Sequence, residues 1–195
     1  QITVKDALDN GIQDLQNTAM TPINRAVILG TIGSIQTNIG NVERAGTTLS
    51  NAMSIVTDSL GQQTAKSLGV GTEFAEWNTV VGNNEQAIKT FDTTDSLFHA
   101  YNLTDTPKYR THLLTYSDFL QENGRYEKSL VVLNQLENAL DEVRNATQET
   151  RDARSDLYNS RGRAYKNLGQ NQQALANLDR ALKLKEDIYG QNNPK

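Results

Sequence analysis

Residues 162–174 read GRAYKNLGQNQQA, and the spacing of their small residues decides the fold. Gly169 lies seven residues after Gly162 and five residues before Ala174, and Leu178 follows four residues later. The same spacing of small and apolar residues occurs three times upstream, around glycines that lie 42, 42 and 45 residues apart. These repeat glycines are Gly40, Gly82, Gly124 and Gly169. A fixed period of this length indicates a repeat architecture rather than a single globular core.

Each repeat is predicted to be a pair of antiparallel helices. A glycine in the left-handed conformation ends the first helix and turns the chain into the second. The small residues before and after that glycine let the two helices approach closely. The second helices are expected to end at residues that lie 20 or 21 positions after the repeat glycines, namely Gly61, Asn102, Asn145 and Gly190.

The predicted helices cover most of the chain. The first helices are expected over about 23–38, 64–81, 107–123 and 150–168, the second helices over 42–60, 84–101, 126–144 and 171–189, and a leading helix over 3–18. The longer spacing before Gly169 predicts either a longer loop or about one extra helical turn between Asn145 and Asp156.

The repeat pattern resembles the tetratricopeptide repeat (TPR), in which a small residue, a glycine seven on and an alanine five beyond it mark the helix pair. The segment that matches best carries Gly162, Tyr165, Gly169, Ala174 and Ala181. The period of about 42 is similar to the long repeats of kinesin light chains and of many bacterial signalling proteins.

The resemblance implies an all-α fold, a right-handed α-solenoid of antiparallel helix pairs with about nine helices. The expected divisions of a single array over 1–195 are a half repeat at 3–20 and repeats at 23–61, 64–103, 107–145 and 150–190. Because a half repeat opens the chain and a repeat boundary closes it, we expect a fragment of a longer chain.

A few residues depart from the family pattern. Gly69 and Gly71 fall inside a predicted helix, where each costs roughly 1 kcal/mol relative to alanine, so we expect looser packing in the second repeat. Arg161 stands at a position that is apolar or aromatic in the family. Trp77, the only tryptophan, is expected to pack between repeats.

Composition narrows the functional classes. The chain has no cysteine, which excludes disulfides, thiol catalysis and cysteine zinc sites. The formal net charge of -4 argues against a nucleic-acid-binding protein, and no apolar run approaches the ~20 residues of a membrane span. His99 and His112 lack the spacing of metal ligands and are expected at the surface or in inter-repeat packing. We find no catalytic constellation, and expect neither an enzyme nor a metal or cofactor.

The resemblance places the partner-binding surface on the concave side, which the first helices line. The concave positions carried over to this chain are Thr72, Glu76 and Thr79, then Leu114, Asp118 and Gln121, then Asn159, Arg163 and Lys166. Residues 151–168 have a balance of +3, from five basic and two acidic residues. One hypothesis is that Asn159, Arg163 and Lys166 meet an acidic segment of a partner; the alternative is an ordinary solvated face with inter-repeat ion pairs.

The favoured interpretation is therefore a non-catalytic scaffold that binds a peptide or a partner protein in its groove. The alternative is a ligand-sensing regulatory module of a larger bacterial signalling protein, such as a kinase, an ATPase or a transcription regulator. We expect a cytoplasmic protein, with the periplasm as the alternative, and a possible homodimer through the ends of the repeats.

Overall fold

The computed structural model describes residues 3–59, 61–143 and 147–190, and within these residues it contains nine α-helices and no strand. The all-α prediction is thereby confirmed. Contacts divide the chain into two compact units, 1–103 and 104–195, and each is described by itself. Among the described residues, no helix combines the length and apolarity needed to cross a bilayer.

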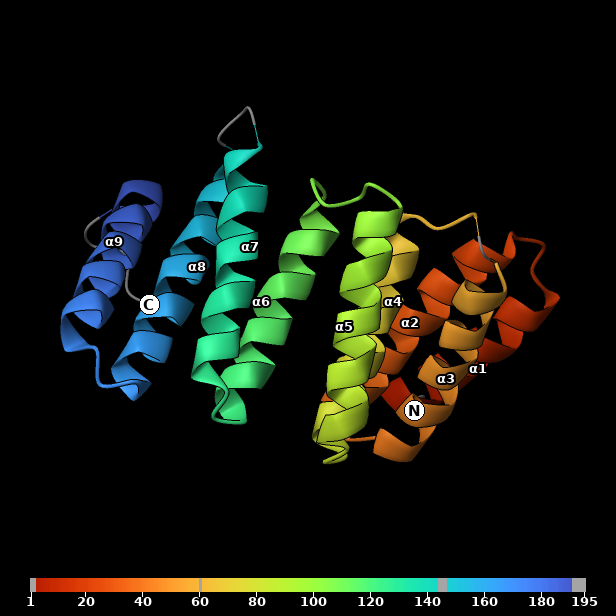
Figure 1. Cartoon of the computed structure of the whole chain (residues 1–195). Helices are drawn as coiled ribbons and strands as arrows, with labels where there is room; N and C mark the ends of the chain where they lie inside the picture. The colour runs from red at the N-terminus through yellow and green to blue at the C-terminus, as the bar shows by residue number, and fades with distance from the viewer. Residues whose placement is uncertain (1–2, 60, 144–146, 191–195) are drawn as a thin grey trace. The chain divides into compact units, whose positions relative to one another are not determined.

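The first unit contains five helices, which Figure 1 shows in red to green. They are α1 (Val4–Asn17), α2 (Pro22–Asn38), α3 (Val42–Asp58), α4 (Ala65–Val80) and α5 (Asn84–Ala100). The second unit contains α6 (Pro107–Glu122), α7 (Tyr126–Asp141), α8 (Gln148–Asn167) and α9 (Asn171–Tyr189). These bounds follow the predicted helices closely. That all of them belong to one continuous array stays a prediction.

The repeat glycines make the turns within each helix pair. Gly40, Gly82, Gly124 and Gly169 have φ values of +77°, +75°, +70° and +72°. At the first of these turns, the backbone N–H of Asn41 donates to the carbonyl of Gln36 at 2.8 Å, and the N–H of Gly40 donates to that of Thr37 at 3.0 Å. This pair of hydrogen bonds is the Schellman motif, which satisfies the last carbonyls of a helix. The other three turns repeat it.

The expected close approach of the paired helices is also present. A Cβ atom at Gly162 of α8 would lie 2.7 Å from Cγ of Leu178 in α9. Gly33 meets Leu49 in the same way in the first unit. A Cβ atom at either glycine would clash with the facing leucine, because carbon atoms do not approach each other more closely than 3.0 Å. The leucine or the helix that carries it would have to move away.

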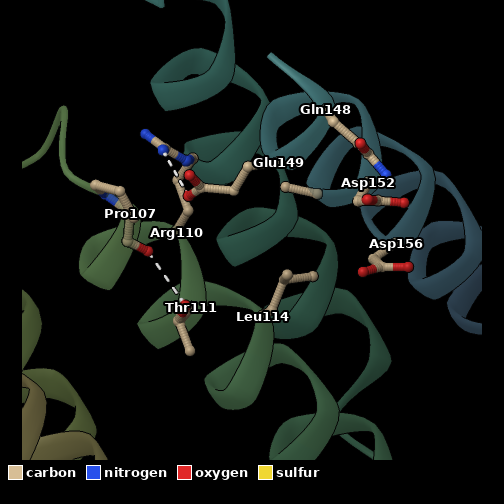
Figure 2. Close-up of a pocket in the computed structure, with 9 residues that line it drawn as sticks. Pro107, Arg110, Thr111, Leu114, Gln148, Glu149, Asp152 and Asp156 are labelled. Atoms are coloured by element: carbon tan, nitrogen blue, oxygen red, sulfur yellow. Dashed lines mark hydrogen bonds and ion pairs between the residues drawn. The ribbon is translucent and has the colours of Figure 1, made fainter. Parts of the chain in front are cut away.

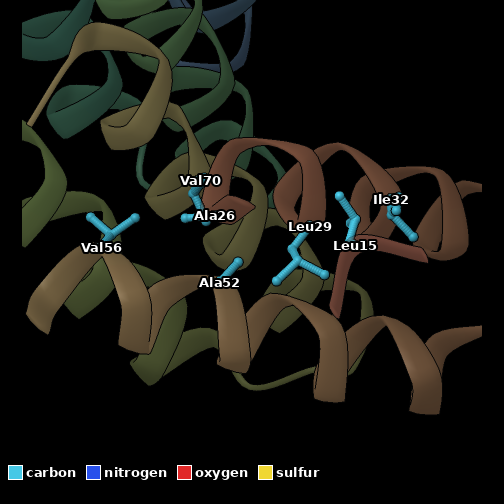
Figure 3. Close-up of a cluster of buried hydrophobic side chains, with 7 residues drawn as sticks. All are labelled: Leu15, Ala26, Leu29, Ile32, Ala52, Val56 and Val70. Carbon is cyan, nitrogen blue, oxygen red and sulfur yellow. The ribbon is translucent and has the colours of Figure 1, made fainter. Parts of the chain in front are cut away.

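The first unit has a core formed by α1, α2, α3 and α4 (Figure 3). Its buried side chains are Leu15, Ala26, Leu29, Ile32, Ala52, Val56 and Val70. The predicted apolar face of the leading helix contributes Leu8 and Ile12 at its edge.

The expectation of loose packing around Gly71 is wrong. Gly71 lies in α4, and the side chain of Thr94 from α5 occupies the space where its Cβ would be. Trp77, by contrast, packs between repeats as predicted: its ring lies against Gly46 of α3, and its Nε1 donates to the carbonyl of Val42 at 2.8 Å.

The second unit shows how the longer repeat spacing is accommodated. Helix α6 begins 17 residues before Gly124, whereas α8 begins 21 residues before Gly169. The four additional residues make about one helical turn, so the extra-turn alternative is the one that forms. The predicted helix end at Asn145 lies outside the described residues.

Arg161 connects α8 to α7. Its Nη2 donates to Oδ1 of Asn134 at 2.6 Å and lies 2.8 Å from Oε2 of Glu137. The side chain is buried, and this pairing explains why a charged residue is accepted where the family has an apolar one.

Candidate functional site

A cleft of about 500 Å³ opens between α6 and α8 in the second unit (Figure 2). It lies between the N-terminal halves of two consecutive first helices. The residues that line it are Pro107, Arg110, Thr111, Leu114, Gln148, Glu149, Asp152, Ala153 and Asp156. Of these residues, only Leu114 is among the concave positions predicted from the sequence.

The acidic residues of the cleft are partly neutralised by basic neighbours. Nη2 of Arg110 lies 3.3 Å from Oε1 of Glu149. Nζ of Lys185 in α9 lies 3.2 Å from Asp152 and 3.5 Å from Asp156. Partial desolvation lowers the pKa of Lys185, but the hydrogen bond to Asp152 and the charge of Asp156 outweigh it, so its pKa is raised. Lys185 therefore stays cationic beside the cleft at neutral pH.

Asp118, one of the predicted residues, lies one helical turn beyond the last cleft residue of α6. Asp118 follows Leu114 by four residues in α6, and Ser160 follows Asp156 by four residues in α8. Oγ of Ser160 donates to Oδ1 of Asp118 at 3.3 Å, and Nη2 of Arg163 lies 2.7 Å from the same oxygen.

Gln121 forms a hydrogen bond with the arginine of this ion pair. Its side chain is only 7% exposed, donates to Oγ of Ser129 at 3.1 Å and accepts from Nε of Arg163 at 3.5 Å. Gln121 was expected to contact a partner; its burial corrects that expectation and makes it a support for Arg163. We call the cleft together with Asp118, Asn159, Arg163 and Lys166 the α6–α8 face.

One of the two cations expected to bind a partner is already paired within the chain. Arg163 was expected to await an acidic partner, but Asp118 of the same unit already pairs with it. Asn159 and Lys166 are exposed on α8. Of the two predicted cations, Lys166 is thus the one that pairs with no acid among the described residues of the chain.

The predicted residues of the first unit are placed less favourably. Thr72 is 5% exposed, so it offers almost no surface to a partner, contrary to the expectation. Thr79 is half-buried and donates its hydroxyl to the carbonyl of Ala75 at 3.1 Å. Glu76 is exposed on α4.

A second cleft, of about 600 Å³, lies between α2 and α4 of the first unit and is not among the predicted binding positions. Its lining is mainly apolar and consists of Met20, Asn24, Val27, Ile28, Thr64, Ala65 and Lys66. Val27 lies 13 residues before Gly40, as Thr111 of the first cleft lies 13 before Gly124. The two clefts therefore occupy the same place in the repeat. Val27 and Ile28, apolar residues beside the core positions Ala26 and Leu29, were the signal that could have found it.

The two histidines differ in exposure. His112 is 0% exposed, and its ring centroid lies 6.3 Å from those of Tyr109 and Tyr116. His99 is exposed on α5. In the part of the chain that the structure describes, no group of three or more histidine, cysteine or acidic residues is arranged to hold a metal ion.

The repeat around Gly169 matches a family model. Residues 155–188, which contain the second half of α8 and nearly all of α9, match the model described as "Tetratricopeptide repeat". These residues form a tetratricopeptide repeat. The match includes Gly162, Gly169, Ala174 and Ala181, four of the residues on which the resemblance was based.

Solved structures extend the TPR fold to the rest of the chain. The kinesin light chain-like TPR repeats of Podosopora anserina are similar with a TM-score of 0.70 and 16% identity, over 95% of this chain and 86% of that one. A variant of those repeats gives a TM-score of 0.57 and 13% identity, over 87% and 98% of the two chains. BtubC (BKLC) of P. vanneervenii gives 0.56 and 14%, over 97% and 92%. At these identities the likeness establishes the fold, an all-α TPR-like solenoid. No curated protein matches the chain in sequence.

Proposed function

We propose that this TPR chain is a non-catalytic scaffold that binds a peptide or a partner protein, and that the α6–α8 face is its binding site in the second unit. TPR folds generally serve as protein–protein interaction scaffolds. The observation that carries the proposal is the cleft between α6 and α8. The Asp118–Arg163 ion pair joins the same two helices one to two turns further along.

The charges of the face would give the ligand a direction. Asp152 and Asp156 line its α8 N-terminal end, whereas Arg163 and Lys166 lie toward the C-terminal end of the same helix. An extended ligand with an acidic segment is expected to place that segment at Lys166. Exposed charges of this kind steer encounter and fix orientation more than they add affinity.

The α2–α4 cleft is the corresponding site of the first unit in this proposal. Because its walls are mainly apolar, with Lys66 at the rim, it would take an apolar side chain of a ligand. The two units would then bind different side chains of a ligand, each through a cleft at the same position in its repeat.

A peptide-display selection on the full chain tests the proposal. The probe is the peptide recovered from a random library, synthesised with a fluorescent label and titrated by anisotropy. We expect Lys166→Glu to weaken its binding about tenfold and to flatten the dependence of Kd on salt, since an exposed pair acts through screened charge. Asp156→Lys should also weaken binding of the peptide, because it reverses a charge at the other end of the face, near the N-terminus of α8.

The matched control is Arg151→Glu, a charge reversal on the same helix outside the cleft lining. It should leave Kd within about twofold. A peptide whose Kd responds equally to all three reversals, or to none of them, would place binding elsewhere and refute this assignment of the α6–α8 face. Lys166 is preferred to Arg163 as the test position, because reversing Arg163 would also break its pair with Asp118.

A further inference from the structure

Arg110 of α6 lines the cleft between α6 and α8, and its guanidinium is incompletely bonded. Its side chain is only 6% exposed, and Nη1 donates to the carbonyl of Asp105 at 3.0 Å. Nη2 lies 3.3 Å from Oε1 of Glu149, whereas the buried Nε has no hydrogen-bond partner among the described residues. Carboxylates typically bind arginine through two parallel N–H···O bonds. The edge formed by Nε and Nη2 therefore makes one bond to a carboxylate where two are possible.

Glu149 is a weakly held partner of Arg110. Its side chain is 62% exposed in the first turn of α8, and its contact of 3.3 Å exceeds the roughly 2.7–2.9 Å of a charge-assisted hydrogen bond. A buried donor that is left without a partner costs free energy. A ligand carboxylate that displaced Glu149 and bonded both Nε and Nη2 would remove that cost.

A carboxylate further along α8 has capacity for a cation. Asp152 already accepts from Nζ of Lys185 at 3.2 Å and from the hydroxyl of Tyr189 at 2.9 Å. Among the described residues, Asp156 forms only the longer 3.5 Å contact with Lys185, and its side chain is 53% exposed. Asp156 is therefore the acidic residue of the cleft that is best placed to pair with a second cation.

The charges around the cleft define the charge of a ligand. Two cations and three anions surround it, so one negative charge is left unbalanced. The cations are Arg110 and Lys185, and the anions are Glu149, Asp152 and Asp156. A ligand carboxylate at Arg110 would release Glu149, which then needs a cation of its own. A ligand with one carboxylate and two cationic groups balances the cleft, and a free basic amino acid has these three groups.

The spacing of these groups fits an extended arginine. Glu149 and Asp156 are seven residues apart in α8, a rise of about 10 Å. Six covalent bonds separate the carboxyl carbon of arginine from its guanidinium carbon, about 7 Å when extended, and a hydrogen bond of ~2.8 Å extends the reach at each end. Figure 2 shows Arg110 and Glu149 together, Asp156 further along α8, and Leu114 of α6 between them in this view. Leu114 and Ala153 line the cleft and offer apolar contacts to the methylene groups of the ligand.

We propose that the cleft between α6 and α8 binds a free basic amino acid such as arginine. Its carboxylate bonds Nε and Nη2 of Arg110, its α-ammonium pairs with the released Glu149, and its side-chain cation pairs with Asp156. Binding of this small ligand does not require that a peptide binds, so the inference and the proposed function are tested independently.

Isothermal titration calorimetry of the full chain with L-arginine tests the proposal. We expect saturable binding of one molecule per chain. Agmatine, which lacks the carboxylate, and L-citrulline, which lacks the charge of the side chain, should each bind at least tenfold more weakly. N-acetyl-L-arginine should bind at least threefold more weakly, because it lacks the ammonium group that pairs with Glu149.

Substitutions then assign each preference to its residue. Arg110→Gln should bring the Kd values of L-arginine and agmatine to within about twofold of each other, and Asp156→Asn should do so for L-arginine and L-citrulline. Glu149→Ala should remove the preference for L-arginine over its N-acetyl form. The matched control is Glu127→Ala, because Glu127 occupies the second position of α7 as Glu149 does in α8. It should leave the Kd of L-arginine within about twofold.

The comparison of ligands on the unsubstituted chain decides the outcome even where a variant fails to fold. Absence of L-arginine binding, or equal binding of L-arginine and agmatine, would overturn the proposal. Binding of N-acetyl-L-arginine as tight as that of L-arginine would also overturn it, because the ligand would then be the C-terminal residue of a peptide. Preferences that persist in folded Arg110→Gln and Asp156→Asn would place the binding site outside this cleft.

Discussion

At the scale of single residues, the presence or absence of a Cβ atom sets the distances between helices. The missing Cβ leaves space for the side chain of Leu178 at Gly162, of Trp77 at Gly46 and of Thr94 at Gly71. At the repeat turns, the same lack of a Cβ permits positive φ values that other residues rarely adopt. Glycines of this chain thus have two roles, and substitution separates them.

Gly124→Ala and Gly11→Ala should change stability in opposite directions. Gly124 has a φ of +70°, where alanine is expected to cost about 1–2 kcal/mol. Gly11 lies inside α1, and a Cβ there would meet only Cδ1 of Ile32 at 4.0 Å, so alanine should stabilise by about 0.5–1 kcal/mol. Urea denaturation followed by circular dichroism measures both. Shifts of the same sign would contradict the division of roles.

At the scale of the element, the two kinds of helix begin differently. The first helices α2, α4, α6 and α8 each have a threonine N-cap whose hydroxyl accepts a backbone N–H. The second helices follow the glycine turns directly and have no side-chain cap. A turn that already satisfies the preceding carbonyls positions the next helix, whereas a first helix enters from a loop and requires a cap.

The capping box of α1 makes its first turn sensitive to acid. Hydrogen bonds to Asp6 from the side chain of Thr3, and then from its backbone, hold the pKa of Asp6 below its ordinary value of 3.8. A lowered pKa means that the carboxylate stabilises the helix above about pH 4. This stabilisation is lost as the pH falls through the lowered pKa.

NMR titration of the Asp6 carboxyl carbon, with amide exchange over the first turn of α1, measures this effect. Thr3→Ala should return the pKa of Asp6 toward 3.8. With Asp6→Asn, the protection of these amides from exchange should no longer depend on pH once the intrinsic pH dependence of amide exchange is subtracted. An Asp6 pKa that Thr3→Ala leaves unchanged would show that the cap is not its cause.

At the scale of the whole molecule, the chain has two compact units, and each contains buried apolar side chains. The first is centred on residues such as Leu29 and Val56. The second buries Leu113, Leu133 and Leu157. Because cooperativity follows the contacts that residues share, each unit is expected to unfold in its own transition.

Trp77 makes this expectation measurable, since the only tryptophan lies in the first unit. In urea, its fluorescence should follow the first unit, whereas circular dichroism follows both, so the two transitions should not coincide. Gly124→Ala should lower the stability seen by circular dichroism by about 1–2 kcal/mol and leave the Trp77 transition in place. Gly82→Ala in the first unit is the matched control and should move the Trp77 transition. Coincident curves that both variants shift equally would contradict two independent units.

Local patterns determined the helices, their pairing and their turns. Hydrogen bonds within a helix join residues four apart, and those of the Schellman turn, such as Asn41 to Gln36, join residues five apart or fewer. The small residues that allow close packing, such as Gly33 and Gly162, recur in the same register. The sequence by itself was therefore sufficient to predict the all-α repeat fold, including the family of residues 155–188.

Only the tertiary structure decided which polar residues remain available. Asp118 and Arg163 are separated by 45 residues, and their ion pair exists because α6 and α8 pack side by side. The burial of Thr72 and Gln121 and the shape of the two clefts likewise depend on the volumes of side chains from neighbouring helices. Periodicity assigns a residue to a side of a helix, but its exposure and its partners depend on packing between helices that are distant in sequence.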